Sequence, residues 1–296
     1  MFTSSKQKKQ SVTFLARTIF VLLLCWPVSA RCEQIVRVPL PEAPGDRRYE
    51  YPRKVLELAL SKVHKDYRVE DATVRMNQDR QVAELIAGRF IDVAQLPFSA
   101  EREAVLLPIR IPLHKGLIGW RIGLIRKGDQ ARFSKIKTAD DLKAVRIGQG
   151  SEWPDVRILR SNGMNVVTGV TYDGLFGMLQ AGRFDYFMRD VIEIWDELRD
   201  HADTMEIEQS FVVHYYYDAY FFVNKGNTKL AEDVRQGLEQ AIADGSFEKL
   251  FQQYWSDCLR KARLNERTVI ELPSPDVNSE TPIWRHELWY SLERSQ

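Results

Sequence analysis

The sequence predicts an α/β protein made of two similar lobes, each a mostly parallel sheet flanked by helices. One observation behind this prediction is a repeated phrase, LIAGRFID at residues 85–92 and LQAGRFD at residues 179–185. The other is that strand-like and helix-like segments alternate along the chain, as they do in parallel sheets. The copies lie too far apart for a solenoid or propeller repeat. Coincidence in a helix-to-strand turn is the alternative interpretation.

Each copy of the repeat predicts a helix that ends at a glycine and is followed by a buried strand. An amphipathic run leads to Gly88 in the first copy and to Gly182 in the second, and a short apolar stretch follows each. Glycine readily adopts the left-handed conformation that closes a helix. The repeat therefore indicates the same helix, turn and strand in both lobes.

The elements around the first copy follow from hydrophobic spacing and from helix-start residues. Proline suits a first helical turn, so a helix is expected to begin near Pro52. Asp79 is expected to cap the helix of the first copy. The predicted elements are, in order, a strand at 34–40, a loop, the helix from Pro52, a second strand with its approach at 67–69 and 73–76, and a helix at 81–87.

The remaining elements continue the same alternation. Thr138 and Thr171 are expected to cap helices, the first in a capping-box arrangement with Asp141. Residues 263–296 are polar and proline-rich and are interpreted as a tail, whose few apolar residues could dock on the body. The predicted elements are a strand at 117–125, a short helix after Thr138, strands at 145–148 and 166–167, the helix of the second copy, a helix at 191–198, a strand at 217–223, and helices at 229–243 and 247–255.

Composition points to an ordinary globular protein. The 296 residues suffice for one large domain or two modest ones, and 44% of them are apolar and 28% charged. The formal net charge is +1, and the first thirty residues contain four basic side chains and no acidic one. The rest of the chain is therefore mildly acidic, which excludes the strongly basic body of a nucleic-acid-binding protein.

The first thirty residues resemble a secretory signal peptide. A basic start is followed by the apolar run 19–25, and Val28 and Ala30 supply small residues for cleavage before Arg31. The apolar run is short for a membrane-spanning helix, and an uncleaved membrane anchor is the alternative. We therefore expect residues 1–30 to be removed and the protein to be periplasmic.

No metal site and no cofactor is expected. The chain has no CxxC and no HExxH pattern, and its five histidines are scattered singly. Cys32 and Cys258 remain after cleavage of the signal peptide. They could pair in an oxidising compartment or stay as two unlinked thiols.

Candidate ligand-binding residues lie where the predicted strands end, because ligands of open α/β sheets bind beyond the carboxyl ends of the strands. Arg102 and Ser99 follow the first copy of the repeat, and Asp190 follows the second. The turn at Gly150 and Ser151 precedes a helix, whose N-terminus favours an anion. Arginine grips a carboxylate bidentately, whereas an aspartate suits an ammonium group. Together these residues describe a site for a zwitterion.

Each candidate also has a purely structural interpretation. Arg102 lies between two glutamates and could form a surface ion pair of little energetic value. Asp190 and Ser151 could simply cap helices. Trp153, Tyr49 and Tyr51 could stack on a ligand, but aromatic residues beside loops more often pack against the protein.

Several segments, taken in order, resemble motifs of the family 3 solute-binding proteins. Residues 99–102 (SAER) resemble the family's Thr-x-x-Arg segment, whose arginine holds the α-carboxylate of the ligand. Residues 140–151 resemble its D-L-K to G-T segment, with serine in place of the threonine. Residues 181–190 resemble G-R-x-D-A-x-x-x-D, whose last aspartate receives the amine. Residues 222–226 and 245–255 resemble the closing motif.

The resemblance implies the two-lobed type II periplasmic-binding fold, with lobe 1 at 34–116 plus 224–262 and lobe 2 at 117–223. Two hinge strands would cross near 116–121 and 219–224. It further implies a monomer that closes on a small polar solute, an amino acid or related zwitterion, and delivers it to the permease of an ABC transporter. The residues implied at the ligand are Arg102, Ser99, Gly150, Ser151, Asp190, Trp153 and Tyr51.

The chain departs from the family pattern in two places. Residues 49–54 replace a longer loop that carries proline and aromatic residues, and Arg189 adds positive charge beside Asp190. Two other functions are considered. An extracytoplasmic sensory subunit would use the same pocket with a sensor receptor as its partner. An enzyme would need an acid/base pair, for which only Glu152 and Asp190 are near, and no motif supports a catalytic residue.

Overall fold

The protein is described by a computed structural model that covers residues 1–2, 33–41, 47–63 and 66–292. Residues 1–32 form one unit and residues 33–296 another, and the description below concerns the second unit. Residues 3–30 of the predicted signal peptide and Cys32 lie outside the described residues. Pairing of Cys32 with Cys258 therefore stays a prediction.

Two small sheets are formed mainly by the first part of this unit. β1 pairs with β2 in parallel, and β11 lies between β3 and β4, antiparallel to both. The backbone N–H of Asp92 donates to the carbonyl of Arg37 at 2.8 Å and links β3 to β1. The elements around these sheets are β1 (Gln34–Val38), η1 (Arg47–Tyr49), α1 (Glu50–Ser61), β2 (Tyr67–Asp71), α2 (Gln78–Ala87), β3 (Val93–Pro97), α3 (Ala100–Val105), β4 (Leu107–Ile109), β11 (Ala219–Val223), α9 (Thr228–Ala243) and α10 (Ser246–Ala262).

A seven-stranded large sheet is formed by the middle of the chain, in the order β12-β10-β5-β8-β6-β7 with β9 also on β5. β6 is parallel to β7 and β8, whereas β5 is antiparallel to β8, β9 and β10. Its elements are η2 (Leu117–Gly119), β5 (Trp120–Arg126), α4 (Gln130–Phe133), α5 (Ala139–Lys143), β6 (Arg146–Gly150), α6 (Asp155–Ser161), β7 (Asn165–Gly169), α7 (Tyr172–Gln180), β8 (Tyr186–Asp190), α8 (Ile194–His201), β9 (Met205–Ile207), β10 (Phe211–His214) and β12 (Thr268–Glu271).

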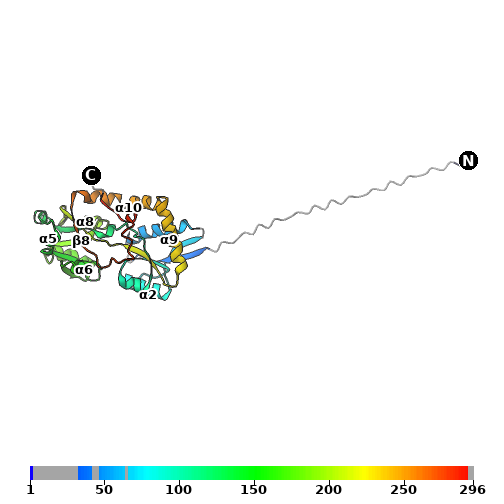
Figure 1. The fold of residues 1–296 in the computed structure, drawn as a ribbon, viewed down its shortest axis with the longest axis horizontal. Helices are drawn as coiled ribbons and strands as arrows, with labels where there is room; N and C mark the ends of the chain where they lie inside the picture. Colours follow the sequence, from blue (N-terminus) through cyan, green and yellow to red (C-terminus); the bar gives the residue numbers. More distant parts are fainter. Residues whose placement is uncertain (3–32, 42–46, 64–65, 293–296) are drawn as a thin grey trace. The chain divides into compact units, whose positions relative to one another are not determined.

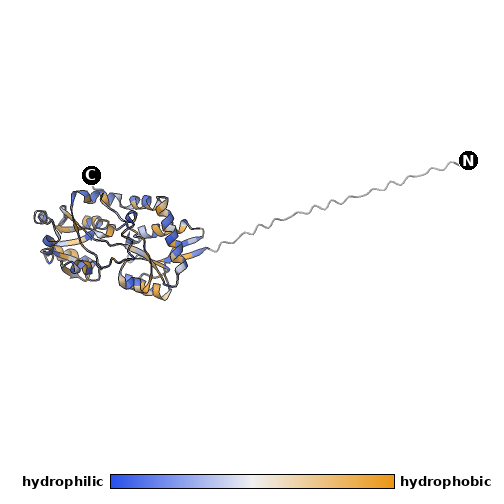
Figure 2. Cartoon of the chain, viewed as in Figure 1, coloured by the Kyte–Doolittle hydropathy of each residue, from blue (hydrophilic) through white to orange (hydrophobic). Residues whose placement is uncertain are grey.

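The predicted α/β class is confirmed, but the expectation of mostly parallel sheets is wrong, because β5 and β11 run antiparallel to every strand with which they pair. Helices and strands alternate along the chain, and helices lie beside the sheets (Figure 1). Helices α9 and α10 carry hydrophilic and hydrophobic residues side by side, as Figure 2 shows, which is typical of helices that bury one face. Within the described residues, no helix combines the length and the apolar character that crossing a bilayer requires.

The repeated segment forms the same connection, from a helix through a glycine turn to a strand, in both copies. Gly88 ends α2 with φ of 63°, and Gly182 after α7 has φ of 68°, both in the left-handed region. In the first copy the carboxylate of Asp92 accepts from the backbone N–H and the guanidinium of Arg37, at 2.9 and 3.0 Å. In the second copy the carboxylate of Asp185 accepts from the same two groups of Arg146, at 3.3 and 3.0 Å. The aspartate of each copy thus ties its strand to a neighbouring strand.

Helix starts were predicted with mixed success. Thr138 and Thr171 accept from backbone N–H groups at the starts of α5 and α7, and the capping box at Thr138 is complete. The expected cap Asp79 is wrong, because α2 begins one turn earlier and the side chain of Asn77 accepts from the N–H of Arg80. Extended backbone at Asn77 aims its side chain at that N–H.

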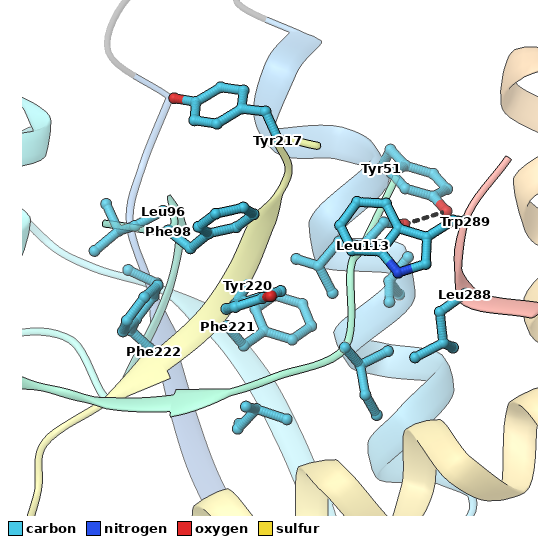
Figure 3. Packing of buried hydrophobic residues seen from close by; sticks show 14 of the residues in the cluster. Tyr51, Leu96, Phe98, Leu113, Tyr217, Tyr220, Phe221, Phe222, Leu288 and Trp289 are labelled. Atoms are coloured by element: carbon cyan, nitrogen blue, oxygen red, sulfur yellow. Dashed lines mark hydrogen bonds between the residues drawn. The ribbon is translucent and has the colours of Figure 1, made fainter. Parts of the chain in front are cut away.

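The segment 264–292 docks on the body. Its strand β12 pairs in parallel with β10 and extends the large sheet. Leu288, at the end of η4 (His286–Leu288), and Trp289 are buried against the same core as Tyr51 and Leu113. Figure 3 shows the two C-terminal side chains beside these residues. Arg285 forms a two-pronged ion pair with Glu239 on α9, at 2.6 and 2.9 Å.

Candidate functional site

Two chain segments, 114–119 and 214–219, cross between the small sheets and the large sheet. The predicted hinge strands near 116–121 and 219–224 are therefore placed a few residues too late, since β5 belongs to the large sheet and β11 to a small one. The carboxylate of Asp218, fully buried, holds the two crossing segments together. It accepts from the N–H of Ala219 at 2.6 Å, the N–H of His114 at 3.3 Å, His114 Nδ1 at 3.1 Å, and the N–H of Gly116. Because one carboxylate satisfies donors from both segments, the crossing is fixed at one point.

Arg102 lies on the short helix α3, directly after β3, and Ser99 caps that helix. The guanidinium of Arg102 donates to the carbonyl of Pro97 at 2.7 Å and to Gln78 Oε1 at 3.0 Å. It forms no ion pair with a carboxylate of the described residues. The alternative of a surface ion pair with the neighbouring Glu103 is wrong, because Glu103 pairs with Arg110 at 2.9 Å. Burial lowers the pKa of Arg102, as expected for a cation that has left water without a compensating anion.

Asp190 ends β8 and is buried. One of its oxygens accepts from the backbone N–H groups of Ile192 and Glu193, at 3.1 and 2.9 Å. This turn delays α8, which begins at Ile194 and not at Val191 as predicted. The other oxygen lies 3.8 Å from a guanidinium nitrogen of Arg121. One oxygen of Asp190 therefore closes a turn and does not cap α8, whose N-cap is Glu193, and a guanidinium faces the other oxygen.

Arg121 is a buried cation, the second residue of β5, whose next four residues are apolar or glycine. It stands opposite Asp190 in the β5–β8 register and is 4% exposed. A guanidinium nitrogen lies 2.5 Å from Asp155, and the hydroxyl of Tyr215 donates to the same carboxylate oxygen. The rings of Tyr215 and Tyr217 lie 5.6 and 5.7 Å from the guanidinium. Although burial opposes it, Asp155 and Tyr215 keep the pKa of Arg121 above its ordinary value.

Tyr217 connects this cluster to Arg102. Burial, followed by the charge of Asp155, raises the pKa of Tyr217, and the charges of Arg121 and Arg102 oppose the rise. The same tyrosine therefore lies within the electrostatic reach of both arginines. Arg102 and Asp190, predicted from opposite halves of the chain, thus both act on this cluster: Asp190 lies beside Arg121, and the charge of Arg102 acts on Tyr217.

The turn after β6 is arranged for packing. The ring of Trp153 covers Gly150 so closely that a Cβ there would lie 2.6 Å from it. Ser151 is exposed, does not cap α6, and its hydroxyl donates to Glu152 at 3.4 Å. Trp153 also carries the guanidinium of Arg189, 4.6 Å from the ring centre. These contacts give Trp153 a packing role at this turn.

The positive charge of Arg189 is compensated. Its guanidinium pairs with Glu197 at 2.7 Å and with Glu193. Strand alternation turns Arg189 to the face of β8 opposite to Asp190. The departure noted in the sequence therefore adds no free charge next to Asp190.

Tyr51 lies in the core, 1% exposed. Its hydroxyl donates to the carbonyl of Leu113 at 2.9 Å, a bond drawn in Figure 3. Its ring lies 5.2 Å from that of His114 and 5.1 Å from that of Trp255. These contacts match the packing interpretation of this aromatic residue.

A pocket with a volume of about 290 Å³ opens beside the small sheets. Gln95 and Phe221 contribute to it from neighbouring strands, and none of the seven predicted ligand residues lines it. Its charged lining is paired: Arg47 with Glu50, and Arg53 with Asp71. The described residues contain no cluster of histidine, cysteine and carboxylate side chains able to hold a metal ion.

The sequence analysis missed Arg121, Asp155, Tyr215 and Tyr217. The sequence does indicate that Arg121 is unusual, since it is the one charged residue within the apolar stretch 117–125. A lone charge in a buried strand requires a partner. Its partner Asp155 comes from a different element and could not be read from local spacing.

Stability should depend on pH through Asp190. Burial, with Glu193 adding to it and Arg121 and Arg189 opposing, raises the pKa of Asp190 to about 7. Between about pH 4 and pH 7 the native state then binds a proton that the unfolded state has lost, so stability falls as pH rises, by up to about 1.4 kcal/mol per unit. Asp190→Asn retains a capping oxygen and should flatten this slope in chemical denaturation. Identical slopes for both proteins would contradict this assignment.

The comparisons with known proteins bear on the fold. The chain matches no protein-family model and no curated protein by sequence. A solved ancestral arginine-binding protein bound to arginine is similar with a TM-score of 0.54 and 19% identity, over 75% of this chain and 98% of its own. A mutant of ArgBP from T. maritima gives 0.52 and 16%, over 76% and 95%. The substrate binding protein of an amino acid ABC transporter gives 0.50 and 16%, over 76% and 100%. These likenesses establish the architecture: the chain has the two-lobed type II periplasmic-binding fold that its resemblance to family 3 solute-binding proteins implied.

Proposed function

We propose that this protein is a periplasmic solute-binding protein that holds a small polar solute by a carboxylate group and presents it to an ABC transporter. The observation that carries the proposal is the guanidinium of Arg102 at the end of β3, partly desolvated and without a carboxylate partner in the described part of the chain. A bound carboxylate would supply the missing anion in the bidentate geometry that arginine favours. The solved proteins of the same fold bind arginine or serve an amino acid transporter, which supports a binding role over catalysis.

Binding would proceed by closure of the two predicted lobes, 34–116 plus 224–262 and 117–223, about the crossing held by Asp218. The strand β11 moves to the first lobe, because it pairs with β3 and β4. Closure excludes water from the charges around Arg102 and Tyr217, and their attraction for a bound anion then rises as the local dielectric constant falls. The segment 264–292 touches both sides, through β12 on the large sheet and Arg285 on α9. It would move with the lobes or limit their travel.

A thermal-shift screen of the purified protein against amino acids, small peptides and organic acids tests the proposal. A ligand present at one hundred times its dissociation constant should stabilise the protein by about 2.7 kcal/mol, which raises the melting temperature measurably. No stabilisation by any of these classes would contradict a solute-binding role.

Arg102→Ala should weaken solute binding about thirty-fold, or about 2 kcal/mol, because it leaves the carboxylate of the solute without a partner. Isothermal titration calorimetry measures the change. Arg199→Ala is a suitable control, since Arg199 is exposed on α8 and its ion-pair partners among the described residues are exposed aspartates. Unchanged affinity of the Arg102 variant would remove this residue from the site.

A further inference from the structure

We infer that the solute is a carboxylic acid without an ammonium group, because Arg121 occupies the position beside Asp190 at which an amine would bind. The inference rests on the proposed function and narrows it. Amino acids and their deaminated counterparts share the carboxylate that Arg102 would hold. They differ in the group that would have to lie near Asp190.

The first step is that the position of Arg121 is fixed by the fold. Arg121 and Asp190 are directly opposed in the register of β5 and β8, which fixes the backbone of Arg121, and the contact with Asp155 at 2.5 Å holds its guanidinium. Tyr215 and Tyr217 flank it at 5.6 and 5.7 Å. The cation is part of the core and is 4% exposed.

The second step is that both carboxylates of the cluster are engaged. Asp155 lies 2.5 Å from the guanidinium of Arg121 and accepts from the hydroxyl of Tyr215. Asp190 caps the turn before α8 with one oxygen and has Arg121 at 3.8 Å from the other. An incoming ammonium group would meet a like charge in front of Asp190, and like charges repel strongly when both are desolvated.

The third step is that the cluster has a hydrogen-bond donor without an acceptor. The Nε–H of Arg121 is buried and has no hydrogen-bond partner among the described residues. Arg102 is a second cation without a carboxylate partner in that part of the chain. A solute that brings acceptor oxygens and no cation satisfies both groups, whereas a zwitterion satisfies one and opposes the other.

Matched pairs of compounds that differ only in the α-ammonium group test the inference on the intact protein. Suitable pairs are L-alanine and propionate, L-aspartate and succinate, L-glutamate and glutarate, L-leucine and 4-methylpentanoate, and L-arginine and 5-guanidinopentanoate. In every pair that binds, calorimetry should show the deaminated acid at least tenfold tighter than the amino acid. An amino acid that binds as tightly as its deaminated partner, or more tightly, overturns the inference and leaves the proposed function standing. Binding by neither member of any pair overturns the proposed function itself.

Arg121→Met removes the internal cation and should shift the preference at least tenfold toward the amino acid of the same pair. Arg160→Met makes the same substitution at an exposed position of α6 and should leave the preference unchanged. A folded Arg121→Met protein with the preference of the unmodified chain would also overturn the inference. If this variant fails to fold, the ratio of affinities within each pair on the unmodified protein decides by itself.

Discussion

Replacing Asp218 with alanine is expected to lower the free energy of unfolding by about 3 to 5 kcal/mol. The substitution strands the buried backbone N–H groups of His114, Gly116 and Ala219, and a buried donor left without a partner costs about 1 to 3 kcal/mol. It also removes the acceptor for His114 Nδ1. Urea denaturation followed by circular dichroism measures the loss.

Two further variants test whether this loss of stability comes from the buried carboxylate of Asp218. Asp218→Asn retains one acceptor oxygen and should lose less stability than the alanine variant. Asp140→Ala removes the same group from a side chain that is 87% exposed and forms an ion pair with Lys143 on the surface, so it should change stability by less than about 0.5 kcal/mol. Equal losses for Asp218→Ala and Asp140→Ala would show that the carboxylate at the crossing contributes nothing beyond a surface charge.

Local patterns predicted those parts of the fold that local chemistry determines. Gly88 and Gly182 close their helices because few other residues tolerate positive φ, and that requirement is visible in the sequence. The side chains of Thr138 and Thr171 cap helices by accepting from backbone N–H groups three residues later in the chain. In each case the cause and the effect lie within one turn of chain.

Helix boundaries were less predictable because competing caps lie close together. Asn77 and Asp79 both fit an N-cap, and only backbone geometry selects Asn77. Asp190 was expected to precede a helix directly, yet its side chain forms a turn that moves the start of α8 to Ile194. One or two hydrogen bonds decide such cases, and spacing alone does not rank them.

The candidate site was only half predictable for a different reason. Arg102 and Asp190 were predicted because each was expected to lie where a strand ends, the edge at which open α/β sheets bind ligands. The ion pair of Arg121 with Asp155, and its place opposite Asp190, depend on which strands become neighbours. Strand order is a long-range property, so the sequence indicated a charge in need of a partner without identifying that partner.

Trp289→Ala is expected to cost about 3 to 5 kcal/mol of stability, the range for removing a large buried aromatic side chain. Trp289 is 8% exposed, and its ring lies against Gly116 and packs edge-on to Tyr216 at 5.1 Å. Its indole N–H donates to the carbonyl of Pro282 at 2.9 Å. Because Gly116 has φ of 75° and no side chain, the ring reaches the backbone of the crossing. The variant should therefore lose both apolar contact and a hydrogen bond.

The same substitution five residues earlier gives the matched control. Trp284 belongs to the same C-terminal segment but is 60% exposed, so Trp284→Ala should change the free energy of unfolding by less than about 0.5 kcal/mol. Denaturation curves for both variants separate the stability lost with the docked side chain from any effect of merely removing a tryptophan. If Trp289→Ala unfolds at the same urea concentration as Trp284→Ala, the segment 264–292 only covers the crossing and does not support it. If Trp289→Ala unfolds at a much lower urea concentration, the segment that composition indicates to be a polar tail is part of the structural core. Two of its apolar residues, Leu288 and Trp289, then support the crossing.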